Sequence, residues 1–275
     1  MADDQSLSRA WEGVADEWAA WARKPGHDSY WRFHKESFFA LLPPAGRLTI
    51  DVGCGEGRVS RDLKALGHNV VAIDVSPTMV DYARAADPSI DVVVGDAARL
   101  PFDDASADLV VAFMSLHDVD DMPEAIREIG RALVDGGVLC MAIVHPINSA
   151  GRFESTEPGA RFVIEGSYLQ PHFYRDAIEH DGLSMTFSSR HWPLQAYFDA
   201  MQLPGWSSKP SVRSRSTRRP LRPEQRALAG KGFPSLSTCA RISDRLRIET
   251  HFSERRRRHA RDGHRDRSQV DYASE

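Results

Sequence analysis

Three glycines separated by single residues stand where a short apolar run gives way to a helical pattern. They are Gly53, Gly55 and Gly57, and they follow the run from Leu48 to Val52. Because glycine has no Cβ, such a loop can turn tightly and bring its backbone within contact distance of a ligand. Glycine-rich loops between a strand and a helix also serve phosphates and dinucleotides, so the loop alone does not identify the ligand.

Two carboxylates follow at the ends of the next two apolar runs. Asp74 comes 17 residues after Gly57, where it can accept hydrogen bonds from both hydroxyls of a ribose. Each such charge-assisted bond contributes roughly 1.5 to 3 kcal/mol. Asp96 follows the third run, where it can accept a hydrogen bond from an adenine amino group, and Leu100 to Phe102 can form an apolar wall beside the ring. Together these positions indicate a site for an adenosine-containing ligand.

The elements that must position these residues alternate between short β-branched runs and helical patterns. Helices are expected over Val59 to Leu66, from Ser76-Pro77, and from Pro123 to Gly136-Gly137. This alternation predicts a doubly wound, mostly parallel, Rossmann-like α/β sheet with helices on both faces. The carboxyl ends of its strands then share one edge, where ligands bind. The expected strands are Leu48 to Val52, Val70 to Ile73, Ile90 to Val94, Leu109 to Phe113 and Val138 to Val144.

Taken together, these segments resemble the class I S-adenosylmethionine-dependent methyltransferases, and within them the small-molecule group related to the ubiquinone/menaquinone methyltransferases. The resemblance covers about residues 10 to 202. It implies S-adenosylmethionine as the cofactor, with its methionine end along the glycine loop and its methyl group toward a pocket roofed by the N-terminal segment and the region after the fifth strand. The cofactor-binding residues it implies are Asp51, Gly53, Cys54, Gly55, Gly57, Asp74, Val75, Met79, Asp96, Ala97 and Phe113.

Methyl transfer to a small organic acceptor requires alignment and exclusion of water, and an oxygen or nitrogen acceptor can also need a base. Neutral imidazole is available near pH 7, so His117, His145 and His191 are the candidate catalytic residues. Each is equally compatible with a structural or substrate-positioning role. Tyr168 and Tyr174 are expected to shape the acceptor pocket. The acceptor, and whether O, N or C is methylated, stay open.

Two other functions share parts of this pattern. A nicotinamide-dependent oxidoreductase would also carry a glycine loop and an acid after the second strand. Against it, none of the five lysines follows a tyrosine by four positions, as a short-chain reductase would require, and the glycine spacing is too tight. A cofactor-binding regulator without catalysis is the second alternative.

Composition and charge bound the remaining possibilities. The longest apolar runs are too short to span a membrane, and the acidic start is not a signal peptide, so a cytoplasmic protein without membrane contact is expected. Three widely spaced cysteines exclude a disulfide scaffold and a zinc module, and no metal is expected. The net charge of −4 divides unevenly, because residues 1 to 202 carry 17 basic and 31 acidic residues while residues 203 to 275 carry 18 and 8.

Three parts are therefore expected: an aromatic-rich helical segment over residues 1–45, which can be a helix packed on the domain or a lid over a ligand cleft, the cofactor-binding domain over 46–202, and a basic tail of low order over 203–275. The tail can be a nucleic-acid-binding arm or a solvated, disordered segment. A third reading is a frameshift near Gln202, because shifting the reading frame by one base permits an apolar strand after Gln202 and, from Gly232 to Ala240, a sequence that resembles the family's final strand. Nucleic acid is not an expected partner. Loss of the final strand would leave the edge of the fifth strand unpaired.

Overall fold

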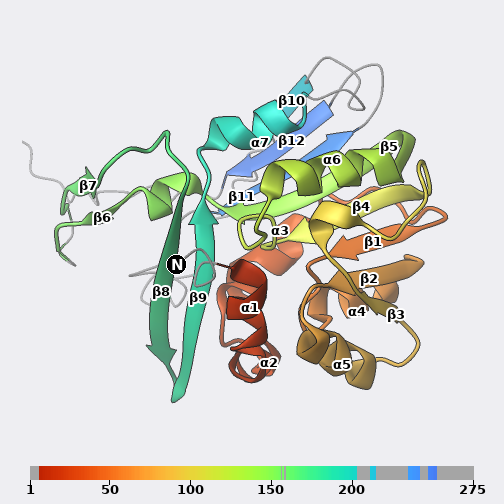
Figure 1. Ribbon diagram of the computed structural model, residues 1–275, viewed down its shortest axis with the longest axis horizontal. Coiled ribbons are helices and arrows are strands. Elements are labelled where there is room, and N and C mark those ends of the chain that lie inside the picture. The colour runs from red at the N-terminus through yellow and green to blue at the C-terminus, as the bar shows by residue number, and fades with distance from the viewer. Residues whose placement is uncertain are drawn as a thin grey trace, which may run out of the picture.

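The computed structural model describes residues 6–155, 157 and 159–202, together with the backbone of three strands further along the chain. At its centre lies an eight-stranded sheet in the order β10-β12-β11-β5-β4-β1-β2-β3 (Figure 1). Its first five strands in sequence are mutually parallel, which confirms the Rossmann-like prediction. Their bounds are β1 Thr49–Val52, β2 Val70–Asp74, β3 Asp91–Val94, β4 Ala107–Phe113 and β5 Leu133–Val144.

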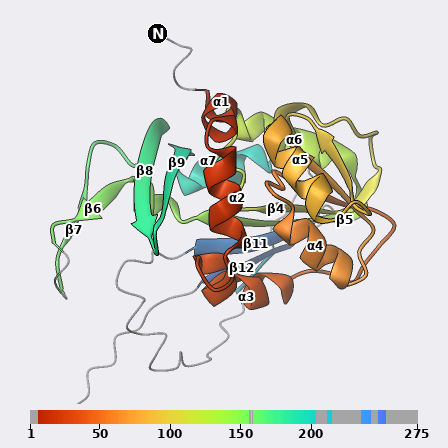
Figure 2. The same cartoon turned by 90° about the horizontal axis from the view of Figure 1, so that it is seen from below.

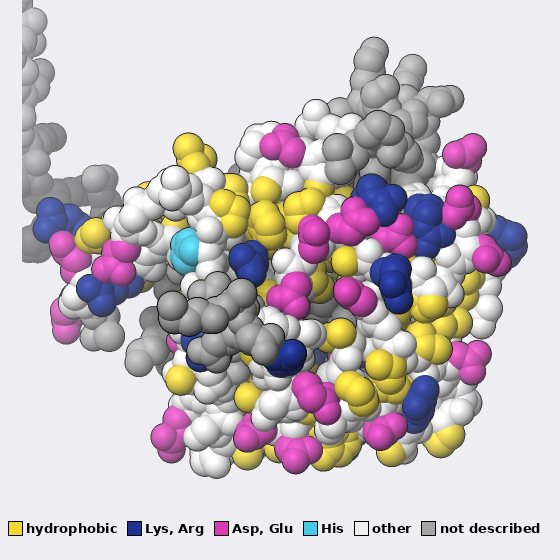
Figure 3. Space-filling model, viewed as in Figure 1, with side chains coloured by type: hydrophobic (Ala, Val, Ile, Leu, Met, Phe, Trp, Pro, Cys, Tyr) yellow, Lys and Arg dark blue, Asp and Glu magenta, His cyan; other side chains and the backbone are white. Residues whose placement is uncertain are grey.

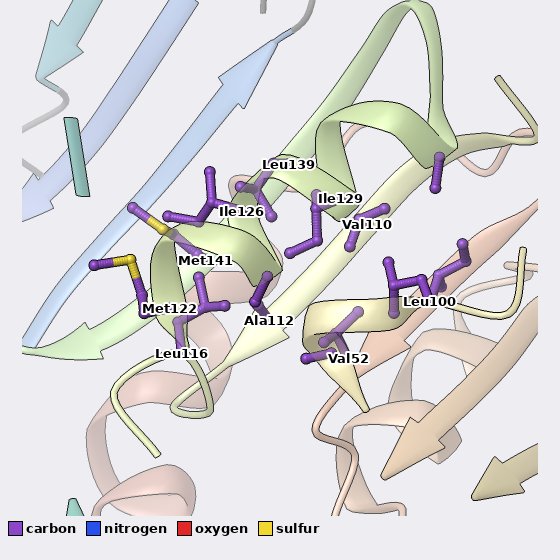
Figure 4. Packing of buried hydrophobic residues seen from close by; sticks show 14 of the residues in the cluster. Val52, Leu100, Val110, Ala112, Leu116, Met122, Ile126, Ile129, Leu139 and Met141 are labelled. Atoms are coloured by element: carbon purple, nitrogen blue, oxygen red, sulfur yellow. The ribbon is translucent and has the colours of Figure 1, made fainter. Parts of the chain in front are cut away.

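Helices cover both faces of this sheet because the central strands are apolar on both sides. Along β4, Val110 and Ala112 face a core formed with α6 (Met122–Ala132) and α7 (Leu194–Ala200), part of which is drawn in Figure 4. The alternate residues Leu109 and Val111 pack in a second core on the other face. That second core is closed by α3 (Lys35–Phe39), α4 (Arg58–Ala65) and α5 (Pro77–Ala86).

Side chains cap the first turns of two helices, and one of these caps, at Ser76, was expected from the sequence. The Ser76 hydroxyl accepts a hydrogen bond from the Met79 amide at 3.0 Å, with Pro77 at the first helical position. The Asp121 carboxylate accepts one from the Glu124 amide at 3.1 Å at the start of α6. The predicted end of α6 at Gly136-Gly137 is wrong, because β5 already begins at Leu133.

The N-terminal segment forms α1 (Leu7–Glu12), α2 (Ala15–Arg23) and the π-helix η2 (Tyr30–His34). Helices α1 and α2 lie between α5 on one side and a long antiparallel hairpin, β8 (His172–His180) and β9 (Leu183–His191), on the other (Figures 1 and 2). A smaller hairpin, β6 (Gly151–Phe153) and β7 (Phe162–Ile164), lies at the periphery. Neither hairpin was predicted from the sequence.

Three strands of the C-terminal part complete the sheet: β10 (Ser211–Ser214), β11 (Ser235–Arg241) and β12 (Arg247–Phe252). The backbone of β11 pairs antiparallel with β5 from Ser235 opposite Val144 to Arg241 opposite Val138. The expectation that the edge of β5 stays unpaired is therefore wrong. The remaining expectations for residues 203–275, including low order, lie outside the described residues.

Charged side chains of both signs are interspersed over α6 on the face shown in Figure 3. Arg131 pairs with Glu128 at 2.9 Å and with Asp104 at 2.7 Å, which ties the helix to the loop before β4. Within the part of the chain that the structure describes, no helix has the length and apolar character needed to cross a bilayer.

Candidate active site

A cavity of about 1110 Å³ opens at the carboxyl ends of the parallel strands. The loops after β1, β2, β3 and β4 form one side of it, and the N-terminal helices and the β8–β9 hairpin form the other. This is the edge at which doubly wound sheets bind ligands. The cavity is large enough for a ligand of nucleoside size together with a second small molecule.

The glycine loop after β1 packs closely against Ser115, which follows β4, and against Trp18 of α2. All three glycines have positive φ, 69° at Gly53, 54° at Gly55 and 84° at Gly57. A Cβ on Gly53 would lie 2.4 Å from the Cβ of Ser115, and one on Gly55 would lie 2.9 Å from the Trp18 indole nitrogen. Side chains larger than hydrogen therefore have no room at either position.

Asp74, at the end of β2, holds this loop in place. One carboxylate oxygen accepts a hydrogen bond from the Gly55 amide at 2.7 Å, and the other accepts one from the Ser76 amide at 3.0 Å. Burial raises the pKa of Asp74, although both amide bonds oppose that shift. A carboxylate offers about four lone-pair directions, so acceptor positions remain on the side that lines the cavity.

Asp51 is a second buried carboxyl on the cavity lining, 1% exposed. Its partner is the Ser60 hydroxyl on α4, which donates to it at 2.5 Å. Burial raises the pKa of Asp51 to about 7. The adjacent Cys54 is a buried free thiol whose pKa is raised by burial, so it is not a reactive thiolate.

The other residues expected to bind cofactor also gather at this edge. Asp96 accepts a hydrogen bond from the Ala98 amide at 2.8 Å, at the start of the short helix η3 (Ala97–Arg99). Gly57 is not on the cavity lining; it precedes α4 as its N-cap, and a Cβ added to it would lie 3.0 Å from the Cβ of Ala83. The expected residues that do line the cavity are Asp51, Gly53, Cys54, Gly55, Asp74, Val75, Met79, Asp96, Ala97 and Phe113.

The three candidate histidines have different surroundings. His191 lies off the cavity, with Nδ1 2.7 Å from the Ser149 hydroxyl and Nε2 2.8 Å from the Tyr168 carbonyl oxygen, so both nitrogens serve the local structure. His145 begins the short helix η4 (Pro146–Ser149), where its Nδ1 accepts a hydrogen bond from the Ile147 amide at 3.2 Å. It too is absent from the cavity lining.

His117 does line the cavity, and it is 7% exposed. Among the described residues its Nδ1 has no hydrogen-bond partner, while Nε2 lies 3.6 Å from an Asp118 carboxylate oxygen. Burial lowers the pKa of His117 to about 4, so its ring is neutral at pH 7. The structure thus separates one histidine with a free nitrogen at the cavity from two with structural bonds.

Around His117 the structure adds polar groups that the sequence did not single out. Asp118 accepts a hydrogen bond from the Ser189 hydroxyl of β9 at 2.6 Å, and burial raises the pKa of Asp118 well above its usual range. Tyr174 of β8, expected to shape the acceptor pocket, lines the same region, and burial raises its pKa to about 12. Tyr168 does not line the cavity, and its hydroxyl accepts a hydrogen bond from the Leu194 amide. The hairpin was unforeseen, so sequence gave no signal for Ser189.

On the N-terminal side, aromatic rings enclose a cation. The Arg58 guanidinium lies 5.0 Å from the centre of the Trp18 ring and 4.4 Å from that of Tyr30. It also forms a nearly buried ion pair with Asp28 at 2.6 Å. These contacts join α4, which follows the glycine loop, to the N-terminal segment over the cavity.

Comparison with known proteins finds methyltransferases. A family model described as a methyltransferase domain matches residues 50–141. An uncharacterised methyltransferase of Mycobacterium tuberculosis is 39% identical over 121 residues, which make up 44% of this chain and 48% of that protein. A malonyl-[acyl-carrier protein] O-methyltransferase of Pectobacterium atrosepticum is 32% identical over 139 residues, 50% of this chain and 51% of that protein. The chain spans about half the length of the curated relatives it matches.

Solved structures agree on the fold. An S-adenosylmethionine-dependent methyltransferase from Mesorhizobium loti superposes with a TM-score of 0.58 at 24% identity, covering 78% of this chain and 98% of that one. A protein from Listeria monocytogenes described as a methyltransferase of the same kind gives 0.56 at 15% identity, covering 75% and 96%. At these identities the likeness concerns the fold alone.

Proposed function

We propose that the chain carries a class I S-adenosylmethionine-dependent methyltransferase domain and transfers a methyl group from S-adenosylmethionine to a small organic acceptor bound in the cavity. The single observation that carries the proposal is the convergence of the glycine loop and the Asp74 carboxylate on one cavity edge. We also propose the ubiquinone/menaquinone-type subgroup, the class of acceptor and the roles of the residues at the cavity.

The residues at this edge fit the cofactor. The loop at Gly53 and Gly55 has no room for side chains but leaves backbone exposed to the cavity, as close approach of a ligand requires. Asp74 has acceptor positions for ribose hydroxyls, and Asp96 and Ala97 lie where an adenine ring would meet the η3 turn. Phe113 and Met79 add apolar surface.

When bound, S-adenosylmethionine supplies a methyl group activated by a positively charged sulfur. This chain's residues bind and orient the two reactants and keep water out. Trp18 and Phe187 meet edge to face at 6.1 Å, closing the N-terminal helices on the β8–β9 hairpin over the cavity. His117 can accept the proton that an oxygen or nitrogen acceptor loses, because its Nδ1 is unpartnered and its ring is neutral.

The charge of the cavity favours one class of acceptor. Carboxylic side chains outnumber arginines on its lining, which carries only Arg32 and Arg58 among the described residues, and Arg58 is already paired with Asp28. Among the described residues the cavity lining therefore offers an anionic acceptor few basic groups to pair with. We therefore assign a neutral hydroxyl or an amine as the acceptor group. The carboxyl acceptor in the name of the Pectobacterium relative does not fit this lining.

Calorimetry of the full chain tests the cofactor assignment. Heat of binding with S-adenosylmethionine and S-adenosylhomocysteine, and none with NADH, is the expected result. Binding of NADH alone would instead identify a nicotinamide oxidoreductase.

Turnover is then measured as S-adenosylhomocysteine released with panels of amines, phenols and alcohols, and carboxylates. Release with an amine or hydroxyl compound supports the proposal. Release with carboxylates only would contradict the acceptor assignment. Cofactor binding without release on any panel would point to a non-catalytic regulator.

A further inference from the structure

A second cluster of polar side chains lies apart from the residues around His117. It is found where the N-terminal segment meets the tip of the β8–β9 hairpin. It consists of His27, from the loop between α2 and η2, His180, the last residue of β8, and Asp181 in the turn. One donor atom from each lies within 4.8 Å of the other two. The three residues come from segments about 150 positions apart, so their spacing along the chain gave no sign of the cluster.

We propose that these three residues form a binding site for one divalent first-row transition metal ion of the Zn²⁺ type. Two imidazoles and one carboxylate are a donor set that such ions prefer, with the fourth position left to water. Asp181 is half exposed, so that water has access from the hairpin tip.

The distances between the donors suit this ion. An Asp181 carboxylate oxygen lies 3.6 Å from His27 Nδ1 and 3.4 Å from His180 Nε2. Ligands at about 2.0 to 2.1 Å from a tetrahedral Zn²⁺ are about 3.3 to 3.4 Å apart. The donor nitrogens of His27 and His180 lie within 4.8 Å of each other. The two rings are stacked, with centres 4.8 Å apart and planes inclined by 28°, so binding one ion requires one imidazole to turn toward the other.

The ring nitrogens of His27 are also available for a metal ion. The residue is 3% exposed, and among the described residues neither Nδ1 nor Nε2 has a hydrogen-bond partner. Leaving such buried groups unsatisfied costs about 1 to 3 kcal/mol, which a metal bond at Nδ1 would offset in part.

One positive charge opposes the ion. Lys24 lies near His27, and its ammonium donates to the Asp181 carbonyl oxygen at 2.9 Å, so it fixes the turn while reducing the local negative potential. With Lys24 beside a single carboxylate, we expect a site of moderate affinity that responds to the supply of metal. Both His27 and His180 line the cavity. A bound ion would therefore hold the hairpin tip against the N-terminal segment at the cavity wall.

The test is titration of the full chain with Zn²⁺ by calorimetry and with Co²⁺ by visible absorption. The informative variant is Asp181→Asn, which removes the charged ligand and keeps the shape. Asn also accepts the positive φ of 50° at this position, so folding should be preserved. Glu179→Gln is the matched control, because it removes one negative charge from the same strand and none of the donors.

The wild type and Glu179→Gln are expected to bind one equivalent, with the Co²⁺ spectrum of a tetrahedral site, and Asp181→Asn is expected to raise the dissociation constant at least tenfold. Co²⁺ should also quench Trp21, whose ring centre is 4.3 Å from that of His27. Hydrogen exchange around residues 24–29 and 177–183 should slow with Zn²⁺. Absence of a stoichiometric site, or equal affinity in Asp181→Asn, would overturn the proposal whatever the methyl acceptor is.

Discussion

The carboxylate of Asp74 accepts a hydrogen bond from the backbone amide of Gly55 at 2.7 Å. The acid after the second strand thus fixes the loop after the first, in addition to facing the cavity. This relationship gives Asp74 a role in shaping the glycine loop, beside the role we propose for it in accepting bonds from the cofactor, and both depend on its negative charge.

Replacement of Asp74 by Asn tests these roles together. The amide group keeps one acceptor oxygen but presents a donor toward either Gly55 or Ser76, so one loop bond and the charge are lost. We expect the dissociation constant for S-adenosylmethionine to rise at least tenfold, corresponding to about 1.4 kcal/mol or more. Calorimetry measures it, with the exposed Asp91→Asn as a control of equal charge change. Unchanged affinity in Asp74→Asn would remove Asp74 from the cofactor site.

Gly55→Ala tests the close contact between the glycine loop and Trp18 of α2. Its Cβ would meet the Trp18 indole nitrogen at 2.9 Å, and the backbone has a positive φ. Gly67→Ala is the matched control, because φ is +89° there and nothing lies within 4 Å of the added Cβ. Positive φ costs each variant roughly 1 to 2 kcal/mol.

The two variants should therefore differ in function more than in stability. We expect Gly55→Ala alone to lose cofactor affinity and to shift the tryptophan fluorescence, as Trp18 is displaced. If Gly67→Ala loses affinity to the same extent, backbone strain rather than the Trp18 contact is responsible.

A pair of glutamine variants distinguishes the proposed catalytic role of His117 from the structural role of His191. His117→Gln removes the proposed base, and positioned bases typically contribute 10² to 10⁴-fold in rate, so we expect kcat to fall by about that factor. His191→Gln breaks two bonds that join Ser149 and Tyr168, so we expect a lower Tm with kcat of the folded enzyme retained. The opposite pattern would assign the base to His191.

The pH profile gives a second check on His117. Because burial holds its pKa at about 4, the ring stays neutral as the pH falls past the usual range of histidine. The wild-type value of kcat/KM should stay level from pH 8 to about 5 wherever circular dichroism shows a folded chain. Because Asp51 on the same cavity has a pKa of about 7, the profile is measured in Asp51→Asn as well. A decline centred near pH 6.5 that persists in this variant would show that another group, or a solvated histidine, is the base.

Asp51 should make the protein less stable as the pH rises. Its folded-state pKa of about 7 lies above the ordinary value of 3.8, so its stabilising contribution is complete at acid pH and is lost as the pH rises toward 7. Asp51→Asn does not titrate and keeps an acceptor for the Ser60 hydroxyl. Relative to this variant, wild type should lose about 2 kcal/mol of unfolding free energy between pH 5 and 8, measured by urea denaturation. A constant difference would show that Asp51 is ionised throughout.

The sequence predicted the parts of the fold that short-range patterns determine. Runs such as Val70 to Ile73 are buried on both faces, so their apolar continuity is visible without a structure, and Ser76-Pro77 carries its helix start in two residues. The opposite wall of the cavity could not be predicted in this way. Strand β8 is mostly exposed and has no clean alternation, so its partners on the cavity wall are set by tertiary packing.

The same reason explains why the sequence did not distinguish among the catalytic candidates. His145 follows a strand end and precedes a proline, a local pattern that looks like a site, yet it starts the short helix η4. Asp118, next to His117, meets Ser189 across 71 positions, and the metal-binding candidates His27 and His180 meet over a longer separation. One sequence does not contain the hairpin geometry that brings these groups together.

The C-terminal part leads to a prediction about the gene. We propose that residues after Gln202 are an out-of-frame reading, because the acidic balance of residues 1–202 turns strongly basic there and the shifted frame permits two apolar strands. The described strand Ser235–Arg241 overlaps the stretch whose shifted reading resembles the family's final strand, and its backbone occupies the antiparallel position beside β5.

Resequencing the codons around Gln202 and Leu203 should reveal one inserted or deleted base. A chain with the restored frame should unfold at a higher Tm and bind S-adenosylmethionine more tightly than the present chain, because the shifted frame permits more apolar residues in the strand that pairs with β5. Both chains can be compared by differential scanning calorimetry with and without cofactor. An intact frame in the gene would refute the proposal and make the basic segment a true part of the protein, whose affinity for nucleic acid and its salt dependence would then be measured directly.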